Sequence, residues 1–573
     1  MKQNLIEKES NTLIELIKKL QLEIQTLKKQ KKYGLVWEDK PEDVVIQCQE
    51  NVPILSEIKD RKIFSQKDKI TNLLIEGDNY HALSVLNYTH KGKINVIYAD
   101  PPYNTGNKSW KYNNDYVEKE DSFRHSKWIS YIHKRVLLAR NLLTDDGILI
   151  FAIDDYEIHT LRLLLDEVMG EDNRLGTIAV VHNPRGRNDD KFFATQHEYM
   201  LIYAKDKVKA KISDFDLTVA DKKQYTKSDD ISPYAETSFM RTGNNSNRHE
   251  RPKLFYPIFY DEKTKKLSLE CTESTIEILP VNQAGEEKTW RWGKETFSRL
   301  CDTDLFVKTV KGSLRIYKKR RLTENIGKKP KTLWYHPRYD ASTQGIMLLQ
   351  DIFGRGNHFN YPKSILLMED ILNITSKKDS LILDFFAGSG TTGHAVLKLN
   401  KGDGGNRKFI LCTNNENKIC EEVTYERIKK VIRGYKNRRG EKVDGLGGNL
   451  SYYRTDIVNI NKLHRISDEA KIKVTFHAGE MIAVREDTLD EVAKNEWWQI
   501  FEGNGRLTAI YFKEDKVRIR ELIDILITKK LPAVLYIFGW GKNEYKSEYT
   551  TENITVEDIP EPILEVYKEI NRL

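Results

Sequence analysis

The sequence predicts an α/β protein whose parallel sheet is interrupted by a long polar insertion. Short apolar runs alternate with helical patterns in two stretches, residues 71–182 and 342–450, and this alternation is typical of a parallel sheet. Residues 183–341, between the two stretches, are polar, irregular, and rich in aromatic and basic side chains. The chain has 573 residues, too many for a single core, so we expect several domains.

The N-terminal residues predict a helix over 1–32. Its apolar side chains follow the spacing of a short coiled-coil seam, although Ser10 interrupts it. The seam consists of Ile6, Leu13, Ile17, Leu20, Ile24 and Leu27. Such a helix would either dimerise or bind a partner, or dock on its own domain, and both interpretations stay open. Residues 33–70 form an extension before the first α/β stretch.

The elements of the two α/β stretches follow from their apolar runs. In the first stretch we expect strands at 72–76, 94–99 and 147–153 and helices at 80–88, 128–143 and 156–169. In the second we expect helices at 364–373, 391–399 and 423–435 and strands at 380–385 and 408–412. A further strand at 197–204 falls within the insertion.

A glycine-rich stretch at 444–448 predicts a hinge before the C-terminal part of the chain. Residues 451–573 predict a small α+β domain, in which we find no chemical motif. Its expected elements are β-like runs at 471–476, 507–512 and 533–538 and a helix at 517–528.

Composition disfavours several classes of protein. Five cysteines form no CxxC pair, so we expect neither a zinc site nor a disulfide framework, and we predict no metal site. We find no signal peptide and no apolar run long enough to span a membrane. The net charge of +8 is modest, so the local clustering of basic residues matters more than their total.

An acidic, proline-rich motif follows the expected strand at 94–99. It reads Asp100-Pro101-Pro102-Tyr103 and lies at the carboxyl end of that strand, where open α/β sheets carry their chemistry. The prolines stiffen the chain and remove two N–H donors, so the motif offers mainly acceptors. Acceptors beside an aromatic ring suit a planar base with an exocyclic amine; the alternative is an ordinary turn. All four residues are candidate catalytic residues.

A glycine-rich turn lies between the expected strand at 380–385 and the helix at 391–399. Two glycines permit a tight turn and close approach of a ligand, and the helix N-terminus offers free N–H groups to a carboxylate. No Gly-Lys-Ser/Thr follows, so this is not a nucleotide-hydrolysing loop. Glu416, after the next strand, lies about where an acid would bind ribose hydroxyls. The candidate ligand-binding residues are Asp384, Phe386, Ala387, Gly388, Ser389, Gly390, Thr391, Thr392 and Glu416.

Together the two motifs resemble those of the β group of amino-methyltransferases acting on DNA. In that group the acidic motif comes first, a target-recognition region next and the glycine loop last, as in this chain. Further stretches resemble the modification subunit of type III restriction–modification systems, and the resemblance covers about residues 33–440. These stretches are 33–38, 76–79, 100–106, 183–187 with 195–198, 251–258 and 361–363. Ser364 stands where such proteins commonly carry proline.

The resemblance implies a Rossmann-like, S-adenosylmethionine-dependent methyltransferase sheet with a circularly permuted motif order. It implies methyl transfer to adenine N6 of a base flipped out of duplex DNA, with cytosine N4 as the alternative. Asp100 and the Pro101 carbonyl would accept hydrogen bonds from the two N–H groups of the amine, and Tyr103 would stack on the base. The resemblance also places Asp78 and Lys363 on the cofactor side. A DNA-binding subunit without catalysis is a further alternative, which the intact motifs disfavour.

The insertion, residues 183–341, is the expected DNA reader. Ten residues of 308–331 are Lys or Arg, and only Glu324 is acidic there. Phosphate contacts position a protein on DNA and base contacts determine which sequence it recognises, so we expect both kinds here. The candidate DNA-binding residues are Arg185, Arg187, Arg241, Asn244, Asn245, Arg248, Trp290, Arg291, Lys318, Lys319, Arg320 and Arg321. The expected partners are double-stranded DNA, a second copy of the chain and a restriction subunit, in the cytoplasm of a prokaryote near the nucleoid.

Overall fold

The computed structural model describes most of the chain, in two compact units. The described residues are 37–65, 70–113, 115–186, 191–323, 327–356, 358–461, 463, 466–513, 517–540 and 545–572. The predicted helix over 1–32 and Arg187 lie outside them. One unit comprises residues up to Ile212 and from Lys331 onward, and the other is Ser213–Pro330. Within the described part of the chain, no helix is long and apolar enough to cross a membrane.

The first unit is built on a ten-stranded sheet in the order β1-β23-β2-β20-β19-β3-β6-β8-β7-β18. Adjacent strands are parallel except for β1 and β8, which run against their neighbours. The strands are β1 (Asn51–Glu57), β2 (Thr71–Glu76), β3 (Ile94–Ala99), β6 (Leu143–Ile153), β7 (Arg174–Val181), β8 (His197–Ala204), β18 (Leu333–Trp334), β19 (Leu381–Asp384), β20 (Lys408–Thr413) and β23 (Asn449–Asn459).

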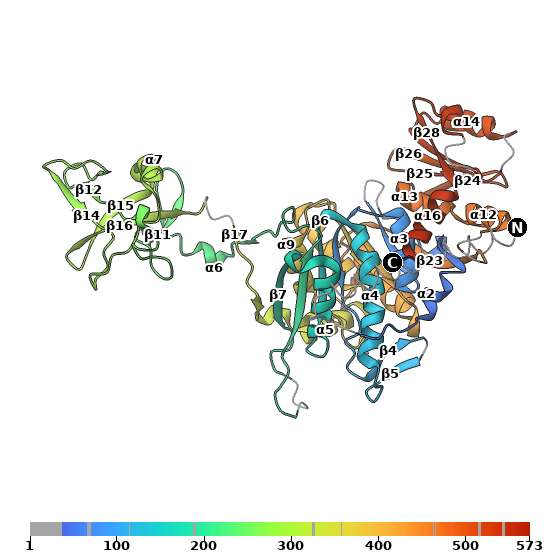
Figure 1. Cartoon of the computed structure of the whole chain (residues 1–573), viewed down its shortest axis with the longest axis horizontal. Coiled ribbons are helices and arrows are strands. Elements are labelled where there is room, and N and C mark those ends of the chain that lie inside the picture. Colours follow the sequence, from blue (N-terminus) through green and yellow to red (C-terminus); the bar gives the residue numbers. More distant parts are fainter. Residues whose placement is uncertain are drawn as a thin grey trace, which may run out of the picture. The chain divides into compact units, whose positions relative to one another are not determined.

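Helices cover both faces of this sheet (Figure 1). Because side chains alternate along a strand, Ile410 and Cys412 of β20 face one side, in the same core as the helices of the first stretch. Phe409 and Leu411 face the other side, where they pack near Gly393. The first side carries α3 (Asn79–Thr89), α4 (Arg124–Leu142) and α5 (Ile158–Leu165), and the second carries α10 (Thr391–Asp403), with α9 (Ile365–Thr375) and α11 (Glu426–Arg433) in contact with it.

The two α/β stretches form one sheet, as predicted. Strand β19 from the second stretch pairs in parallel with β3 from the first, with Asp384 opposite Tyr98. The residues after each strand therefore meet at the same edge of the sheet. Asp100 follows β3 and the glycine turn follows β19, so the two motifs are neighbours although 284 positions separate Asp100 from Asp384. We call this edge the catalytic edge.

Three boundaries differ from those expected. Strands β8 and β18, inside the expected insertion 183–341, belong to the central sheet, so the separate unit is the shorter Ser213–Pro330. Strand β23 also joins this sheet rather than a separate C-terminal domain. The expected hinge at 444–448 packs on α11, with the N–H of Gly447 donating to the Ile432 carbonyl, so it is a packed turn.

The C-terminal residues form a second, five-stranded sheet in the order β24-β25-β26-β27-β28. Residues 471–476, expected as β-like, lie in a helix that Ser467 caps by accepting from Ala470 N. The elements are α12 (Asp468–His477), α13 (Gly479–Glu486), β24 (Asp490–Lys494), β25 (Trp498–Gly503), β26 (Arg506–Tyr511), α14 (Ile519–Thr528), β27 (Ala533–Phe538), α15 (Lys546–Tyr549), β28 (Ile554–Ile559) and α16 (Glu561–Ile570).

The second unit, Ser213–Pro330, consists of small antiparallel sheets around an aromatic core. Phe239 stacks on Trp290 with ring centroids 5.3 Å apart. Its larger elements are β11 (Pro233–Ser238), β12 (Ile258–Asp261), β14 (Thr275–Ile278), α7 (Lys294–Asp304), β15 (Leu305–Val310) and β16 (Ser313–Arg321). The short ones are β9 (Phe215–Asp216), α6 (Val219–Lys222), β10 (Lys227–Ser228), β13 (Leu267–Ser268) and β17 (Gly327–Lys328).

Candidate active site

The acidic motif is held rigidly at the end of β3. The indole of Trp128, on α4, donates to the Pro102 carbonyl at 2.7 Å. Asn104, fully buried and with a φ of 56°, donates to Glu157 and accepts from the indole of Trp110. Such buried, satisfied hydrogen bonds fix the chain that follows the prolines. The motif is therefore preorganised rather than an ordinary surface turn.

Four side chains converge beside this motif: Asp100, Tyr103, Glu198 and Lys363. The Tyr103 hydroxyl lies 2.8 Å from Asp100 Oδ1 and 3.0 Å from Glu198 Oε2. The Lys363 ammonium lies 2.6 Å from Glu198 Oε2 and 3.2 Å from Asp100 Oδ1, and it also contacts the Tyr103 hydroxyl. The Asp100 side chain keeps 23% of its surface exposed, so a ligand can reach it. We call these four residues the catalytic cluster.

The cluster keeps its charges because one ammonium serves two carboxylates. Burial raises the pKa of the Asp100 carboxyl; Lys363 opposes this rise and the Glu198 carboxylate adds to it. Burial would also raise the pKa of Glu198, but Lys363, His182 and the Tyr103 hydroxyl together lower it. Burial alone would lower the pKa of Lys363, yet the two carboxylates raise it. The ammonium is therefore charged, and Asp100 is the member closest to taking a proton.

The structure changes the position expected for Lys363. It was expected on the cofactor side, but its ammonium lies in the catalytic cluster, 4.7 Å from the centroid of the Tyr103 ring. Glu198, the second residue of β8, was not among the predicted site residues. Its only signal in the sequence was its place in the stretch 195–198 that resembles the family, because an acidic residue near the start of a strand does not by itself indicate a site.

The glycine turn adopts the tight conformation expected of it. Gly388 and Gly390 have φ values of +48° and +76°, in the left-handed region that favours glycine. A Cβ at Gly388 would lie 3.1 Å from Cζ of Phe359, so this ring approaches the backbone of the turn closely. Gly390 ends the turn as the N-cap of α10. A side chain at residue 388 would therefore crowd the Phe359 ring.

Most of the polar side chains predicted around this turn are occupied in holding it. Asp384 accepts from the backbone N–H of Phe386 and from the Thr392 hydroxyl, and burial raises its pKa to about 7. Arg427, which the sequence did not reveal, is fully buried and donates to Ser389 and to the Thr391 hydroxyl. Burial lowers the pKa of Arg427 to about 9. A ligand would therefore meet mainly the backbone of the turn.

Two further candidates lie on the catalytic edge. Asp78 caps α3 by accepting from Tyr80 N at 2.6 Å and lies 3.3 Å from the buried guanidinium of Arg135. Its side chain is 40% exposed, so one side of the carboxylate remains accessible. Glu416, just after β20, pairs at 2.7 Å with Lys111. Lys111 belongs to a hairpin of β4 (Asn107–Tyr112) and β5 (Asp115–Glu118), which the sequence analysis did not foresee.

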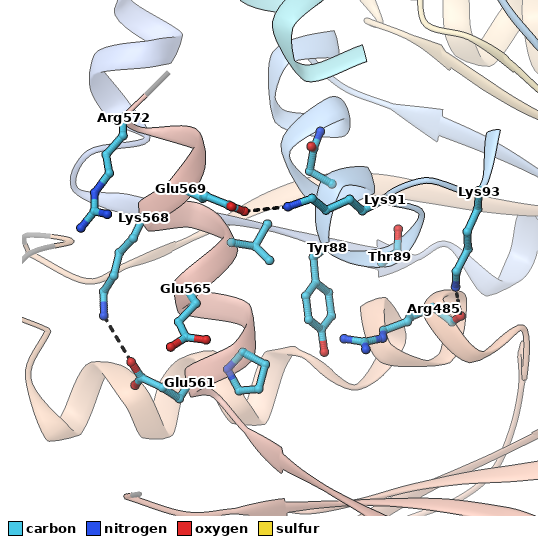
Figure 2. Close-up of a pocket in the computed structure, with 13 residues that line it drawn as sticks. Tyr88, Thr89, Lys91, Lys93, Arg485, Glu561, Glu565, Lys568, Glu569 and Arg572 are labelled. Atoms are coloured by element: carbon cyan, nitrogen blue, oxygen red, sulfur yellow. Dashed lines mark hydrogen bonds and ion pairs between the residues drawn. The ribbon is translucent and has the colours of Figure 1, made fainter. Parts of the chain in front are cut away.

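A surface cavity of about 690 Å³ lies elsewhere in the first unit and contains none of the predicted site residues. Helix α3 begins at the catalytic edge and its 11 residues span about 16 Å, so its last residues reach the other edge of the sheet. Figure 2 shows Tyr88 at this end of α3 beside Arg485 of α13, with Lys91 paired to Glu569 of α16 at 2.8 Å. This cavity marks the junction with the C-terminal elements rather than the active site.

In the second unit, the structure rules out part of the predicted DNA-binding set. Trp290 is 2% exposed and donates its indole N–H to the Tyr256 carbonyl, so it is a core residue. Arg321 is 3% exposed and pairs with Asp229 and Asp304. For these two residues the prediction of DNA contact is wrong, because neither side chain reaches the surface.

The remaining candidates have diverse surroundings. Asn244, Asn245 and Arg291 are exposed, although Arg291 Nε donates to the Ser238 carbonyl. Arg248 pairs with Glu287 and Lys319 with Asp229. Arg241 and Lys318 are half-buried; Lys318 lies over the Trp292 ring, and Arg320 donates to Gln224. Arg185 is exposed in the first unit.

Comparisons with known proteins identify the family of this chain. A family model described as DNA methylase matches residues 94–425. The chain is 33% identical over 465 residues to the type III restriction-modification enzyme EcoPI Mod subunit of Escherichia phage P1, covering 74% of this chain and 71% of that protein. It is 34% identical over 367 residues to the type II methyltransferase M.KpnI of Klebsiella pneumoniae, covering 64% and 86%.

A third relative is the type III restriction-modification enzyme StyLTI Mod subunit of Salmonella typhimurium, at 28% identity over 404 residues, covering 65% of this chain and 57% of that protein. The residues matched by the family model, 94–425, include both the acidic motif and the glycine turn. They also include β8 with Glu198, and Lys363. With more than half of its 573 residues matched and both motifs at one edge of one sheet, the chain belongs to the DNA methylase family.

Proposed function

We propose that this DNA methyltransferase transfers the methyl group of S-adenosylmethionine to N6 of an adenine flipped out of duplex DNA. We further propose that it is the modification subunit of a type III-like restriction–modification system. One observation carries the proposal: the acidic motif and the glycine turn follow the neighbouring parallel strands β3 and β19. A methyl donor in the turn and an acceptor base at the motif would then share one edge of the sheet.

The residues of the glycine turn fit the proposed cofactor. A carboxylate suits the backbone N–H groups at the start of α10 and the positive end of that helix. The Phe359 ring beside Gly388 offers an apolar wall. The carboxylates of Asp78 and Glu416 would accept hydrogen bonds from the amino group and the ribose hydroxyls of the cofactor. When bound, S-adenosylmethionine would supply the methyl group.

The catalytic cluster fits an exocyclic amine. The Asp100 carboxylate and the Pro101 carbonyl would accept hydrogen bonds from the two N–H groups of N6. These hydrogen bonds draw the nitrogen toward tetrahedral geometry and expose its lone pair to the methyl group. The same carboxylate stabilises the positive charge that develops on the nitrogen, an electrostatic effect in a preorganised site. Tyr103 would stack on the base and replace part of the stacking lost on flipping.

Lys363 occupies part of the space that this mechanism assigns to the base. Its ammonium lies at once on Asp100 and over the Tyr103 ring. Entry of the base would therefore require the ammonium to withdraw toward Glu198, which it already contacts at 2.6 Å. After that movement Asp100 is free to accept from the amine, while the positive charge stays near enough to favour the ionised carboxylate.

A direct test uses purified protein, unmethylated genomic DNA and S-adenosylmethionine. Nucleosides from the treated DNA are analysed by mass spectrometry, with an Asp100→Ala variant as the matched control. We expect N6-methyladenine with the wild-type protein and none with the variant. N4-methylcytosine in place of N6-methyladenine would refute the adenine assignment, and no methylated base at all would refute the function.

Partners follow from the same proposal. We propose that two copies associate through the helix predicted over 1–32 and that a restriction subunit joins them. Light scattering would show whether deletion of these residues converts a dimer to a monomer. Phosphate contacts from Arg185 and from the second unit would position the DNA. The half-buried Arg241 and the exposed Asn244 and Asn245 would read its bases.

A further inference from the structure

A loop with two exposed phenylalanines rises from the catalytic edge. It leaves β7 after Val181 and returns to β8 at His197. Strand β3 is parallel to β6, and both β6 and β7 are antiparallel to β8. Strand β7 therefore runs in the same direction as β3. The loop therefore emerges at the edge that carries Asp100. Figure 1 shows it extending away from the sheet beyond β7.

The base of the loop is cross-linked by hydrogen bonds. The N–H groups of His182 and Asn183 both donate to the Gln196 carbonyl at 3.1 Å. The Gln196 side-chain amide donates to the Pro184 carbonyl at 2.8 Å. A Cβ at Gly186 would lie 2.7 Å from Cβ of Ala194, so the two arms also touch there. The loop thus has a built stem that holds its outer residues in a defined place.

The outer residues expose a large apolar surface. Phe192 is 82% exposed and Phe193 is 90% exposed, the latter among the highest values of the large apolar side chains described. Lys191 extends its ammonium to 5.1 Å from the Phe192 ring. Two adjacent exposed phenylalanines with no packing role are costly to leave in water and indicate a binding function. The stretch 185–191 carries Arg185, Arg187 and Lys191 against Asp189 and Asp190, a small net positive charge that suits a polyanionic partner.

The pair also lies within reach of the catalytic cluster. Phe193 is five residues from Glu198, so their Cα atoms are at most about 18 Å apart. Glu198 itself contacts Tyr103 and Lys363. An element at this distance from the pocket would meet the DNA next to the base that enters the pocket. Proteins that distort duplex DNA commonly insert Phe, Leu or Ile between bases.

We propose that Phe192 and Phe193 form an aromatic wedge that enters the base stack beside the target base and fills the gap left when that base flips. The inference rests on the proposed function, because it requires a flipped base. Lys191 and Arg185 would contact the flanking phosphates and hold the wedge against the duplex. The wedge thereby lowers the cost of unstacking that a base in an intact duplex imposes on the enzyme.

The test compares two substrates. The methylated site is first mapped by sequencing DNA treated with the wild-type protein. Two oligonucleotide duplexes then carry this site, one with the target base correctly paired and one with it opposite an abasic position. An unpaired base costs less to flip, so the wedge should matter mainly for the paired substrate. The variants are Phe192→Ala/Phe193→Ala and, as a conservative control, Phe192→Leu/Phe193→Leu.

For the alanine variant we expect kcat/KM to fall about tenfold to 100-fold on the paired duplex and less than about threefold on the unpaired one. The leucine variant should keep most of the activity, since leucine also serves as a wedge. Phe64→Ala changes another exposed phenylalanine, 64% exposed and outside the loop, and should have no effect. Thermal unfolding should be unchanged in every variant.

Equal losses on the two duplexes, or no loss on either, would overturn the wedge. Fluorescence of 2-aminopurine at the target position gives a second measurement, because it rises when that base leaves the stack. The alanine variant should give a smaller rise than the wild-type protein on the paired duplex, and an equal rise would also overturn the proposal. If the wild-type protein methylates no DNA, the proposed function fails first and the wedge falls with it.

Discussion

Replacing Lys363 by methionine removes the one ammonium shared by Asp100 and Glu198. Lys363 Nζ lies 3.2 Å from Asp100 Oδ1, and two unit charges at that separation attract by about 5 kcal/mol at an effective dielectric of 20. The cost of desolvating the ammonium offsets much of this attraction. A loss of about 1.4 kcal/mol nevertheless suffices for a tenfold change in the ratio of ionised to protonated Asp100 at a given pH.

The sign of the effect follows from the charges. Burial already raises the pKa of Asp100, and Lys363 opposes that rise. Methyl transfer requires ionised Asp100, so activity is lost as pH falls through this pKa. Without the ammonium the pKa of Asp100 rises further, and the acidic limb of the kcat/KM profile moves to higher pH. Lys363→Arg keeps the charge and should leave the limb close to its wild-type position.

Glu198→Gln provides the opposite perturbation. The Glu198 carboxylate adds to the rise in the pKa of Asp100, so its removal should move the acidic limb to lower pH. The assay measures transfer of a labelled methyl group to DNA between pH 5 and 9, with both variants in parallel. This account of the cluster would be refuted if the acidic limb moved in the same direction in Lys363→Met and Glu198→Gln. A Lys363→Met profile identical to that of the wild type would refute it as well.

The other expected outcomes concern single residues. Asp100→Ala should abolish methylation while calorimetry shows S-adenosylmethionine binding within a few-fold of wild type; substantial methylation would contradict its role. Gly388→Asp should abolish that binding, because the side chain would crowd Phe359 and repel a carboxylate, whereas Gly402→Asp, with open space around it, should not. Arg135→Met should lower the free energy of unfolding by about 3–5 kcal/mol in urea titrations, because Glu42 would be left buried without its cation; a loss below 1 kcal/mol would show that the pair is dispensable.

The central sheet could be predicted because its strands are short, apolar and alternate with helices. The separation of the two motifs along the chain does not prevent them from meeting, since parallel strands bring their carboxyl ends to one edge wherever they occur in the sequence. The prediction of a β-like run at residues 471–476 is wrong for a physical reason. Their alternating pattern suits a strand, but burial of Ala470 and Val474, four residues apart, together with the Ser467 cap, favours a helix.

The catalytic cluster could be predicted only in part. Asp100 and Tyr103 stand in a conspicuous local motif, whereas Glu198 and Lys363 reach it from elements 95 and 260 residues away from Tyr103. No local pattern predicts that Glu198 lies beside Tyr103. Their proximity depends on the strand order β3-β6-β8, in which β8 pairs with β6. The same applies to Arg427, whose buried guanidinium holds the glycine turn from a later helix.

The second unit shows why composition overstates a binding surface. Basic and aromatic residues indicated nucleic acid, but a unit of this size also needs large side chains for its own core, and Trp290 serves that need. Likewise the cations of β16 and its neighbours are partly neutralised within the unit, since Asp229 pairs with both Lys319 and Arg321. Each phosphate contact contributes one released counterion to the salt dependence of binding, so only cations that face the DNA count. The number of phosphates held by the 308–331 run must therefore be smaller than its ten basic residues suggest.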